Sequence, residues 1–152
     1  TFTGQNIGAK KYDRVKKGIF QGIVMSAIYT LVVSVLLFLF GKNVIGIFSS
    51  DQDVLSFGQE VISIIVPFYL TMTVHQIIMG TLRGAGRTLA TMLIGVGNMC
   101  VLRMIYIHFL VPFNPSFHAV VMCYPVTWIT TMTMDLLYCW KAKWLPRDGA
   151  RG

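Results

Sequence analysis

The stretch GIFQGIVMSAIYTLVVSVLLFLFG, residues Gly18 to Gly41, decides the class of protein to which this chain belongs. It holds 24 residues in a row without a charge and is rich in Ile, Val, Leu and Phe. A helix rises about 1.5 Å per residue, so a run of this length crosses a hydrocarbon core about 30 Å thick. We therefore predict a membrane-spanning helix here.

The composition of the whole chain agrees with this prediction. Of the 152 residues, 55% are hydrophobic even without Gly, whereas soluble domains average about 45–50% with Gly included. Charged residues make up 12%, so there is too little polar surface to coat a globule in water. The same figures exclude a disordered chain, and three Cys are too few for a disulfide-stapled domain.

Three further apolar stretches follow the first. The second carries Pro67, which a membrane helix tolerates where neighbouring groups satisfy the freed carbonyl. The third contains Arg103, and we expect it to end at the turn Pro112-Phe113-Asn114-Pro115. The fourth contains Pro125 and Asp135. The sequence predicts an all-α membrane protein with four transmembrane helices, at about residues 18–41, 58–82, 88–111 and 117–140.

Basic residues mark one side of the predicted membrane. The loops that precede the first span, join the second to the third and follow the fourth hold Lys10, Lys11, Arg14, Lys16, Lys17, Arg83, Arg87, Lys141, Lys143, Arg147 and Arg151. The alternate loops hold only Lys42. Because cytoplasmic loops are enriched in Lys and Arg, we expect residues 1–17 and the tail 141–152 to be cytoplasmic. The net charge of +7 thus indicates topology in the bilayer of the cytoplasmic membrane, and no nucleic-acid partner is expected.

The loop after the first span contains a helix-start signal. Ser50 would cap a helix, and the side chain of Asp53, three residues later, would accept from the Ser50 backbone N–H in return. We expect a short interfacial helix to begin there.

The opening of the chain carries a recognisable motif. Residues Gly4 to Gly18, GQNIGAKKYDRVKKG, resemble the cytoplasmic signature of the multidrug and toxic compound extrusion (MATE) transporters, GQN-x-GA followed by a basic run. The matching positions are Gly4, Gln5, Asn6, Gly8 and Arg14. In that family the signature follows the second and the eighth of twelve transmembrane helices, and four predicted spans follow it here. The resemblance therefore implies that the four spans correspond to helices nine to twelve of such a transporter. The chain would then be a C-terminal fragment that lacks the N-terminal part of its polypeptide.

A second stretch supports the resemblance. Residues Gly80 to Thr88, GTLRGAGRT, resemble the end of helix ten and its inner loop, with Arg83, Gly84 and Gly86 at the matching positions. The family exports drugs and other organic xenobiotics, many of them cationic, in exchange for H⁺ or Na⁺. The resemblance thus implies an antiporter and not an enzyme, with no cofactor apart from the coupling ion.

Physical chemistry assigns the two cytoplasmic loops a structural role. Gly4, Gly8, Gly84 and Gly86 permit a positive φ and close backbone approach, which predicts tight turns against helix ends. Cations beside a span are the general rule, so we expect these loops to fix topology and not to bind substrate.

Polar residues inside the spans are candidates for the substrate or ion path, because ionisable groups in a membrane are costly. His75 and Gln76 follow Pro67, where a broken helix could hold a solute, and a neutral His can exchange a proton near physiological pH. Asn98 and Arg103 lie in the third span. Each has an alternative as a helix-packing contact, and Arg103 could pair with carbonyls or with an acid on another helix.

The acids depart from the pattern of some family members. Those members carry an acid on helix ten where this chain has Thr73. Glu60 and Asp135 are predicted at the outer end of the second span and the inner end of the fourth. We therefore expect the coupling carboxylate on other helices, and the choice between H⁺ and Na⁺ stays open.

Other kinds of site lack support in the sequence. The three His have no metal-site spacing, and no Walker A, Gly-x-Ser-x-Gly or His-Glu-x-x-His motif occurs. Two alternatives to drug export remain. A lipid-linked oligosaccharide or polysaccharide flippase of the same superfamily would need basic residues along its cavity. An intramembrane enzyme would need catalytic polar pairs converging at one depth, which the spans do not predict.

Overall fold

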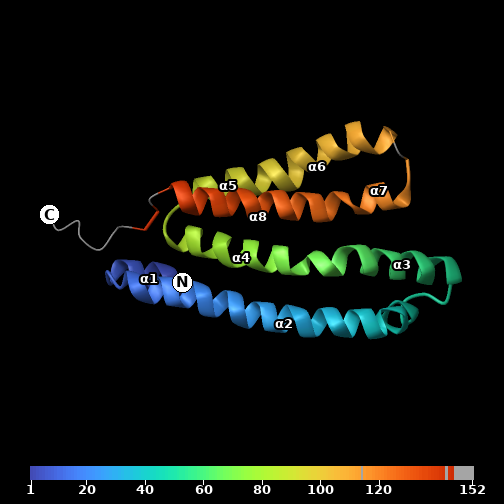
Figure 1. The fold of residues 1–152 in the computed structure, drawn as a ribbon, viewed down its shortest axis with the longest axis horizontal. Coiled ribbons are helices and arrows are strands. Elements are labelled where there is room, and N and C mark those ends of the chain that lie inside the picture. The colour runs from blue at the N-terminus through green and yellow to red at the C-terminus, as the bar shows by residue number, and fades with distance from the viewer. Residues whose placement is uncertain (114, 143, 146–152) are drawn as a thin grey trace.

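The computed structural model describes residues 1–113, 115–142 and 144–145, and these are almost entirely helical. Four long helices run antiparallel along an elongated bundle (Figure 1). The first is α2 (Tyr12–Gly46), and the short helix α1 (Phe2–Gly8) precedes it. The second runs without interruption through α3 (Gln52–Ile65), η1 (Val66–Phe68) and α4 (Tyr69–Gly84). The third consists of α5 (Thr88–Val96), η2 (Gly97–Leu102), α6 (Arg103–Ile105), η3 (Tyr106–Leu110) and η4 (Val111–Phe113). The fourth consists of α7 (Phe117–Val121) and α8 (Cys123–Lys141).

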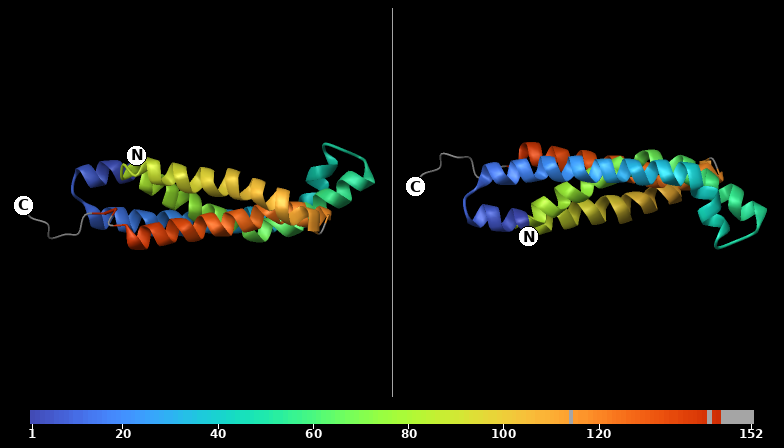
Figure 2. Two further views of the ribbon diagram at one scale, coloured as in Figure 1. Left: turned by 90° about the horizontal axis from the view of Figure 1, so that it is seen from above. Right: turned by 90° about the horizontal axis from the view of Figure 1, so that it is seen from below.

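All four long helices have the length and apolar composition needed to cross a membrane, which confirms the predicted fold class. Their connections alternate between the two ends of the bundle (Figures 1 and 2). We call the end that carries α1, the α4–α5 turn and the last turn of α8 the basic end. The other end carries the α2–α3 turn and the connection from η4 to α7. The predicted positions Asn114, Lys143, Arg147 and Arg151 lie outside the described residues.

The second long helix forms the centre of the bundle. Its α4 segment packs against α2 on one side and α8 on the other, and α5 and η2 pack against α8. The buried core lies mainly along this helix, where Val66, Ile78 and Leu82 are buried. By contrast, most of α2 leaves its apolar side chains exposed, as a helix surface that contacts lipid does.

Prolines account for two local changes of helix geometry. Around Pro67 the helix tightens into the 3₁₀ turn η1, and the hydroxyl of Thr71 donates to the Phe68 carbonyl at 2.7 Å. Pro125 lies in the first turn of α8, where its missing N–H interrupts the ladder, and this explains why α7 and α8 meet at a break at Met122.

The third long helix is widened into π-helix at η2 and η3. At η2 the cause is visible in Asn98, whose side-chain Nδ2 donates to the carbonyl of Ile94 at 3.1 Å. That carbonyl is the one that the Asn98 backbone N–H would bind in a regular α-helix, so the side chain competes with the ladder. Such widened turns occur frequently at functional sites.

The helix start in the α2–α3 turn differs from the prediction. Asp51, not Ser50, is the N-cap, and its carboxylate accepts from the Asp53 backbone N–H at 2.9 Å. The helix that begins at Gln52 is no short interfacial helix, because it continues through η1 into α4. The Asp51 carboxylate is the more favourable N-cap than the Ser50 hydroxyl, because its charge also interacts favourably with the positive end of the helix dipole.

The basic end also differs from the prediction. The signature segment, predicted as a loop, forms the helix α1, and α2 begins at Tyr12. The turn between them is made by Lys10, with φ of 55°, and not by Gly8. In the α4–α5 turn the prediction is confirmed, since Gly86 adopts φ of 77°.

Candidate functional site

A buried histidine–carboxyl pair joins the second and fourth long helices. The Nδ1 atom of His75 on α4 lies 2.5 Å from Oδ2 of Asp135 on α8. The His75 side chain is 2% exposed and that of Asp135 is 0% exposed. His75 lies nine residues before the end of α4, about 14 Å from the basic end of that helix. The pair therefore lies well inside the bundle.

This pair is the main feature that the sequence reasoning missed. The sequence placed Asp135 at the end of its span and apart from His75, and it predicted no converging polar pair. The structure instead brings the two side chains into contact. Counting residues along the helices would have indicated that the two side chains lie at a similar depth in the membrane. His75 and Asp135 lie nine and six residues before the ends of two helices that run in the same direction. The sequence does not show that these two helices are neighbours.

The pair forms the part of a polar column along one face of α8 that lies nearer the basic end. Thr127, Thr131 and Asp135 follow one another at four-residue spacing, and each is 0% exposed. The hydroxyl of Thr131 donates to the Thr127 carbonyl at 2.5 Å. Such backbone bonding satisfies each Thr within its own helix, and among the described residues no threonine hydroxyl is bound to the Asp135 carboxylate. Oδ1 of Asp135 is buried and has no hydrogen-bond partner among the described residues.

Arg103 continues the column toward the opposite end. Its Nη2 donates to Oγ1 of Thr127 at 3.0 Å, and its guanidinium lies 4.4 Å from the centroid of the Tyr124 ring. The predicted alternatives were backbone carbonyls or an acid on another helix. Among the described residues Arg103 contacts neither, and a hydroxyl and an aromatic face take their place. Its buried Nε has no partner there.

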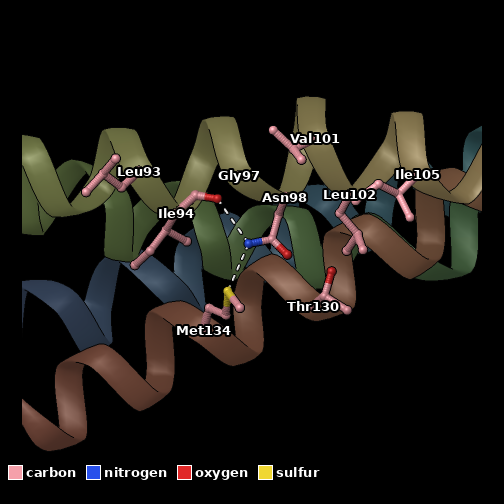
Figure 3. A pocket seen from close by; sticks show the side chains of 9 residues that line it. All are labelled: Leu93, Ile94, Gly97, Asn98, Val101, Leu102, Ile105, Thr130 and Met134. Carbon is pink, nitrogen blue, oxygen red and sulfur yellow. Dashed lines mark hydrogen bonds between the residues drawn. The ribbon is translucent and has the colours of Figure 1, made fainter.

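Asn98 lies at an apolar groove between the third and fourth long helices (Figure 3). Its Nδ2 also contacts the Met134 sulfur at 2.9 Å, so the residue both joins the helices and lines the groove. The groove has a volume of about 600 Å³. Its lining is otherwise almost entirely aliphatic, and consists of Leu93, Ile94, Gly97, Val101, Leu102, Ile105, Thr130 and Met134.

Gln76 does not join His75. It lies on the exposed side of α4, beside a smaller groove of about 280 Å³ that α1 and α2 also line. The two residues are adjacent in sequence and so point about 100° apart on the helix. The predicted His75 and Gln76 site is therefore divided between two sides of α4.

The predicted signature residues lie at the basic end, and two of them meet. A Cβ on Gly84 would lie 2.9 Å from Cβ of Thr3, and a Cβ on Gly4 would lie 3.2 Å from the Gly84 carbonyl oxygen. The start of α1 thus packs directly on the end of α4. The other signature side chains make local contacts or point outward. Asn6 donates to the Phe2 carbonyl, Arg83 donates to the Met79 sulfur, and Gln5 and Arg14 are exposed.

A second histidine–carboxyl pair, also missed by the sequence reasoning, lies at the opposite end. His118 on α7 contacts Glu60 on α3, and the rings of Phe57 and Phe117 pack beside them with centroids 5.0 Å apart. His118 is 66% exposed, so this pair is accessible whereas the His75–Asp135 pair is enclosed. No group of three or more potential metal ligands occurs among the residues that the structure describes.

Comparison with known proteins identifies the family. A family model described as MatE matches residues 1–108. The chain belongs to the MatE family. The resemblance of its signature segments to MATE transporters is confirmed, and with four apolar helices the chain is a multi-pass membrane protein. No solved structure matches it significantly.

Several curated bacterial proteins are similar to this MatE chain. The probable multidrug resistance protein YoeA of Bacillus subtilis is 32% identical over 88 residues, which are 58% of this chain and 19% of YoeA. The probable multidrug resistance protein NorM of Thermotoga maritima is 31% identical over 94 residues, 62% of this chain and 20% of that protein. YpnP of Bacillus subtilis, with the same description, is 31% identical over 103 residues, 68% of this chain and 23% of YpnP. The matched segments thus span about a fifth of these relatives.

Proposed function

We propose that the protein acts in cation-coupled antiport, exporting drugs and other organic xenobiotics across the cytoplasmic membrane with its basic end in the cytoplasm. Membership of the MatE family and the similarity to proteins named multidrug resistance proteins support this proposal. The observation that carries it is the buried His75–Asp135 pair. Ionisable groups inside membrane helices are expensive and in most cases belong to a substrate or ion path.

The groove at Asn98 supports an organic, largely apolar substrate. It offers aliphatic walls, one carboxamide and the polarisable sulfur of Met134. Flexible thioether side chains adapt to ligands of different shape, which suits an exporter of varied compounds. The substrates that we propose are small organic cations, whose charge Asp135 could balance.

The coupling ion is H⁺ or Na⁺, and no other cofactor is proposed. An antiporter needs a group that binds the ion and the substrate alternately. Asp135 is a carboxylate within the bundle, so this chain supplies a candidate group that the sequence had assigned to other helices. The basic-end loops are proposed to fix topology, since the contact of Gly4 with Gly84 is a packing contact.

The alternative functions have weaker support. A flippase for lipid-linked glycans would favour basic residues along its cavity, and no basic residue lines the Asn98 groove. The sequence predicted no converging polar pair of the kind that an intramembrane enzyme would need. The contact of His75 with Asp135 corrects that expectation. In such an enzyme the other imidazole nitrogen would activate a nucleophile. No hydroxyl or thiol of the described residues is hydrogen-bonded to Nε2 of His75.

An efflux assay tests the proposal. The complete natural polypeptide is expressed in a bacterial strain that lacks its own drug pumps, and ethidium accumulation is followed with and without Na⁺ at fixed pH. We expect lower accumulation than in the empty-vector strain, and restored accumulation when the gradient of the coupling ion is abolished. Unchanged accumulation of ethidium and of a fluoroquinolone would contradict drug export. Movement of a lipid-linked glycan under the same conditions would favour the flippase.

A further inference from the structure

The His75–Asp135 pair has few acceptable charge states. With protons on both imidazole nitrogens and none on the carboxylate its net charge is zero. Removing one imidazole proton leaves a buried negative charge, and adding a proton to the carboxylate leaves a buried positive one. An uncompensated buried charge is strongly destabilising, whereas a matched pair is tolerated. The enclosed pair therefore keeps both imidazole protons unless another positive charge replaces one of them.

The geometry indicates which proton can leave. Nδ1 of His75 contacts Oδ2 of Asp135, and this hydrogen bond keeps a proton on Nδ1 in either state. Nε2 has no hydrogen-bond partner among the described residues, so its proton is the exchangeable one. On the other side of the pair, Oδ1 of Asp135 is buried and unpartnered in the described part of the chain. That oxygen is an acceptor available to an incoming cation.

We propose that His75 and Asp135 form a proton-exchange site, at which one organic cation displaces one proton and the net charge stays zero. In the step the Nε2–H bond of protonated His75 breaks, the proton passes to water, and the cation's charge takes its place beside the carboxylate. The reverse step releases the cation. This inference rests on the proposed export function, because it specifies the coupling ion as H⁺. The pair is enclosed here, so exchange requires a conformation in which the bundle opens toward one side.

Few charged side chains face the pair from α1, η1, α2 and α4. The α1 segment carries no titratable side chain, and neither does η1. The acidic and basic residues of α2 are Asp13, Arg14, Lys16, Lys17 and Lys42, and its segment against α4 presents Thr30 to Thr73 instead. On α4 itself, Arg83 is two turns away and bonded to Met79.

The elements on the far side of the pair add four further groups. Cys139 lies one turn from Asp135 on α8. Arg103 of α6 is bound to Thr127 and Tyr124, and His118 of α7 is bound to Glu60 at the opposite end. The thiol of Cys100 lies on η2, in a groove with Met79 and Arg83.

The test measures how drug affinity depends on pH. The dissociation constant for ethidium is measured by fluorescence on the purified complete polypeptide in detergent, at several pH values. If one proton leaves for each cation bound, affinity rises about tenfold per pH unit wherever the pair is protonated. We expect this slope in the natural protein and in Cys123→Ala, which changes a buried residue that takes no part in the pair. We expect a flat dependence in Asp135→Asn, which keeps the shape of the side chain, and in His75→Gln.

The outcomes separate this inference from the proposed function. A flat pH dependence in the natural protein, or an unchanged slope in Asp135→Asn or in His75→Gln, would overturn the proton-exchange site while leaving drug export intact. Failure of the natural protein to bind and export any drug would instead overturn the proposed function. If Asp135→Asn does not fold, the comparison of the natural protein with His75→Gln decides. If neither variant folds, the number of protons that the natural protein releases for each ethidium bound is measured instead. Release of no proton would overturn the proton-exchange site.

Discussion

Glycine contacts set the distance between α1 and α4. A Cβ on Gly84 would come within 2.9 Å of Cβ of Thr3, closer than such atoms approach in folded proteins. We predict that Gly84→Ala lowers the free energy of unfolding by about 1–3 kcal/mol, because α1 must shift. Gly80→Ala is the matched control on the same helix, since its Cβ would meet nothing within 4 Å. Denaturant unfolding in mild detergent measures both, and equal stability of the two variants would contradict the contact.

The contact of Arg103 with Tyr124 is a second feature at the residue scale. A guanidinium over an aromatic face contributes about 0.5–2 kcal/mol, and more when it is desolvated. In a double-mutant cycle with Arg103→Met and Tyr124→Leu, we predict a coupling energy in this range. Tyr29, 72% exposed on α2, supplies the control, and Arg103→Met with Tyr29→Leu should be additive. Additivity in both cycles would show that the Arg103–Tyr124 contact contributes nothing to stability.

The start of the second long helix tests the structure at the scale of an element. Asp51 accepts from the Asp53 backbone N–H, whereas Ser50 is exposed and makes no hydrogen bond among those described. We predict that Asp51→Ala lowers the free energy of unfolding by about 1 kcal/mol, the usual effect of losing an N-cap. Ser50→Ala should leave it unchanged. The opposite ranking in denaturant unfolding would support the cap inferred from sequence alone.

The capping error shows what local patterns leave open. Ser49, Ser50 and Asp51 all belong to residue types that cap helices, and sequence alone did not rank them correctly. The position of α1 was missed for a related reason. Its seven residues are too few to give a clear apolar period, and it is stabilised by packing on α2 and α4, which no local pattern reports.

At the scale of the whole molecule, hydrophobicity predicted the four long helices because each must satisfy its backbone and cover about 30 Å of lipid. The candidate site was only partly predictable. His75, Asn98 and Arg103 could be selected as polar residues in apolar spans. Their partners Asp135, Met134 and Thr127 lie 60, 36 and 24 residues away in sequence, and depend on which helices are neighbours and how each is rotated.

The placement of the basic end on one side of the membrane is the claim on which transport direction depends. Cys100, Cys123 and Cys139 are first replaced by Ala. Single cysteines are then introduced near the opposite end, at Ser50 or Ser116, and near the basic end, at Lys11 or Ala142. Intact cells are treated with a membrane-impermeant maleimide. We predict that Ser50→Cys and Ser116→Cys react from outside, and that Lys11→Cys and Ala142→Cys react only after the membrane is opened. Labelling of Ser116→Cys and Ala142→Cys from the same side would contradict the four-span topology.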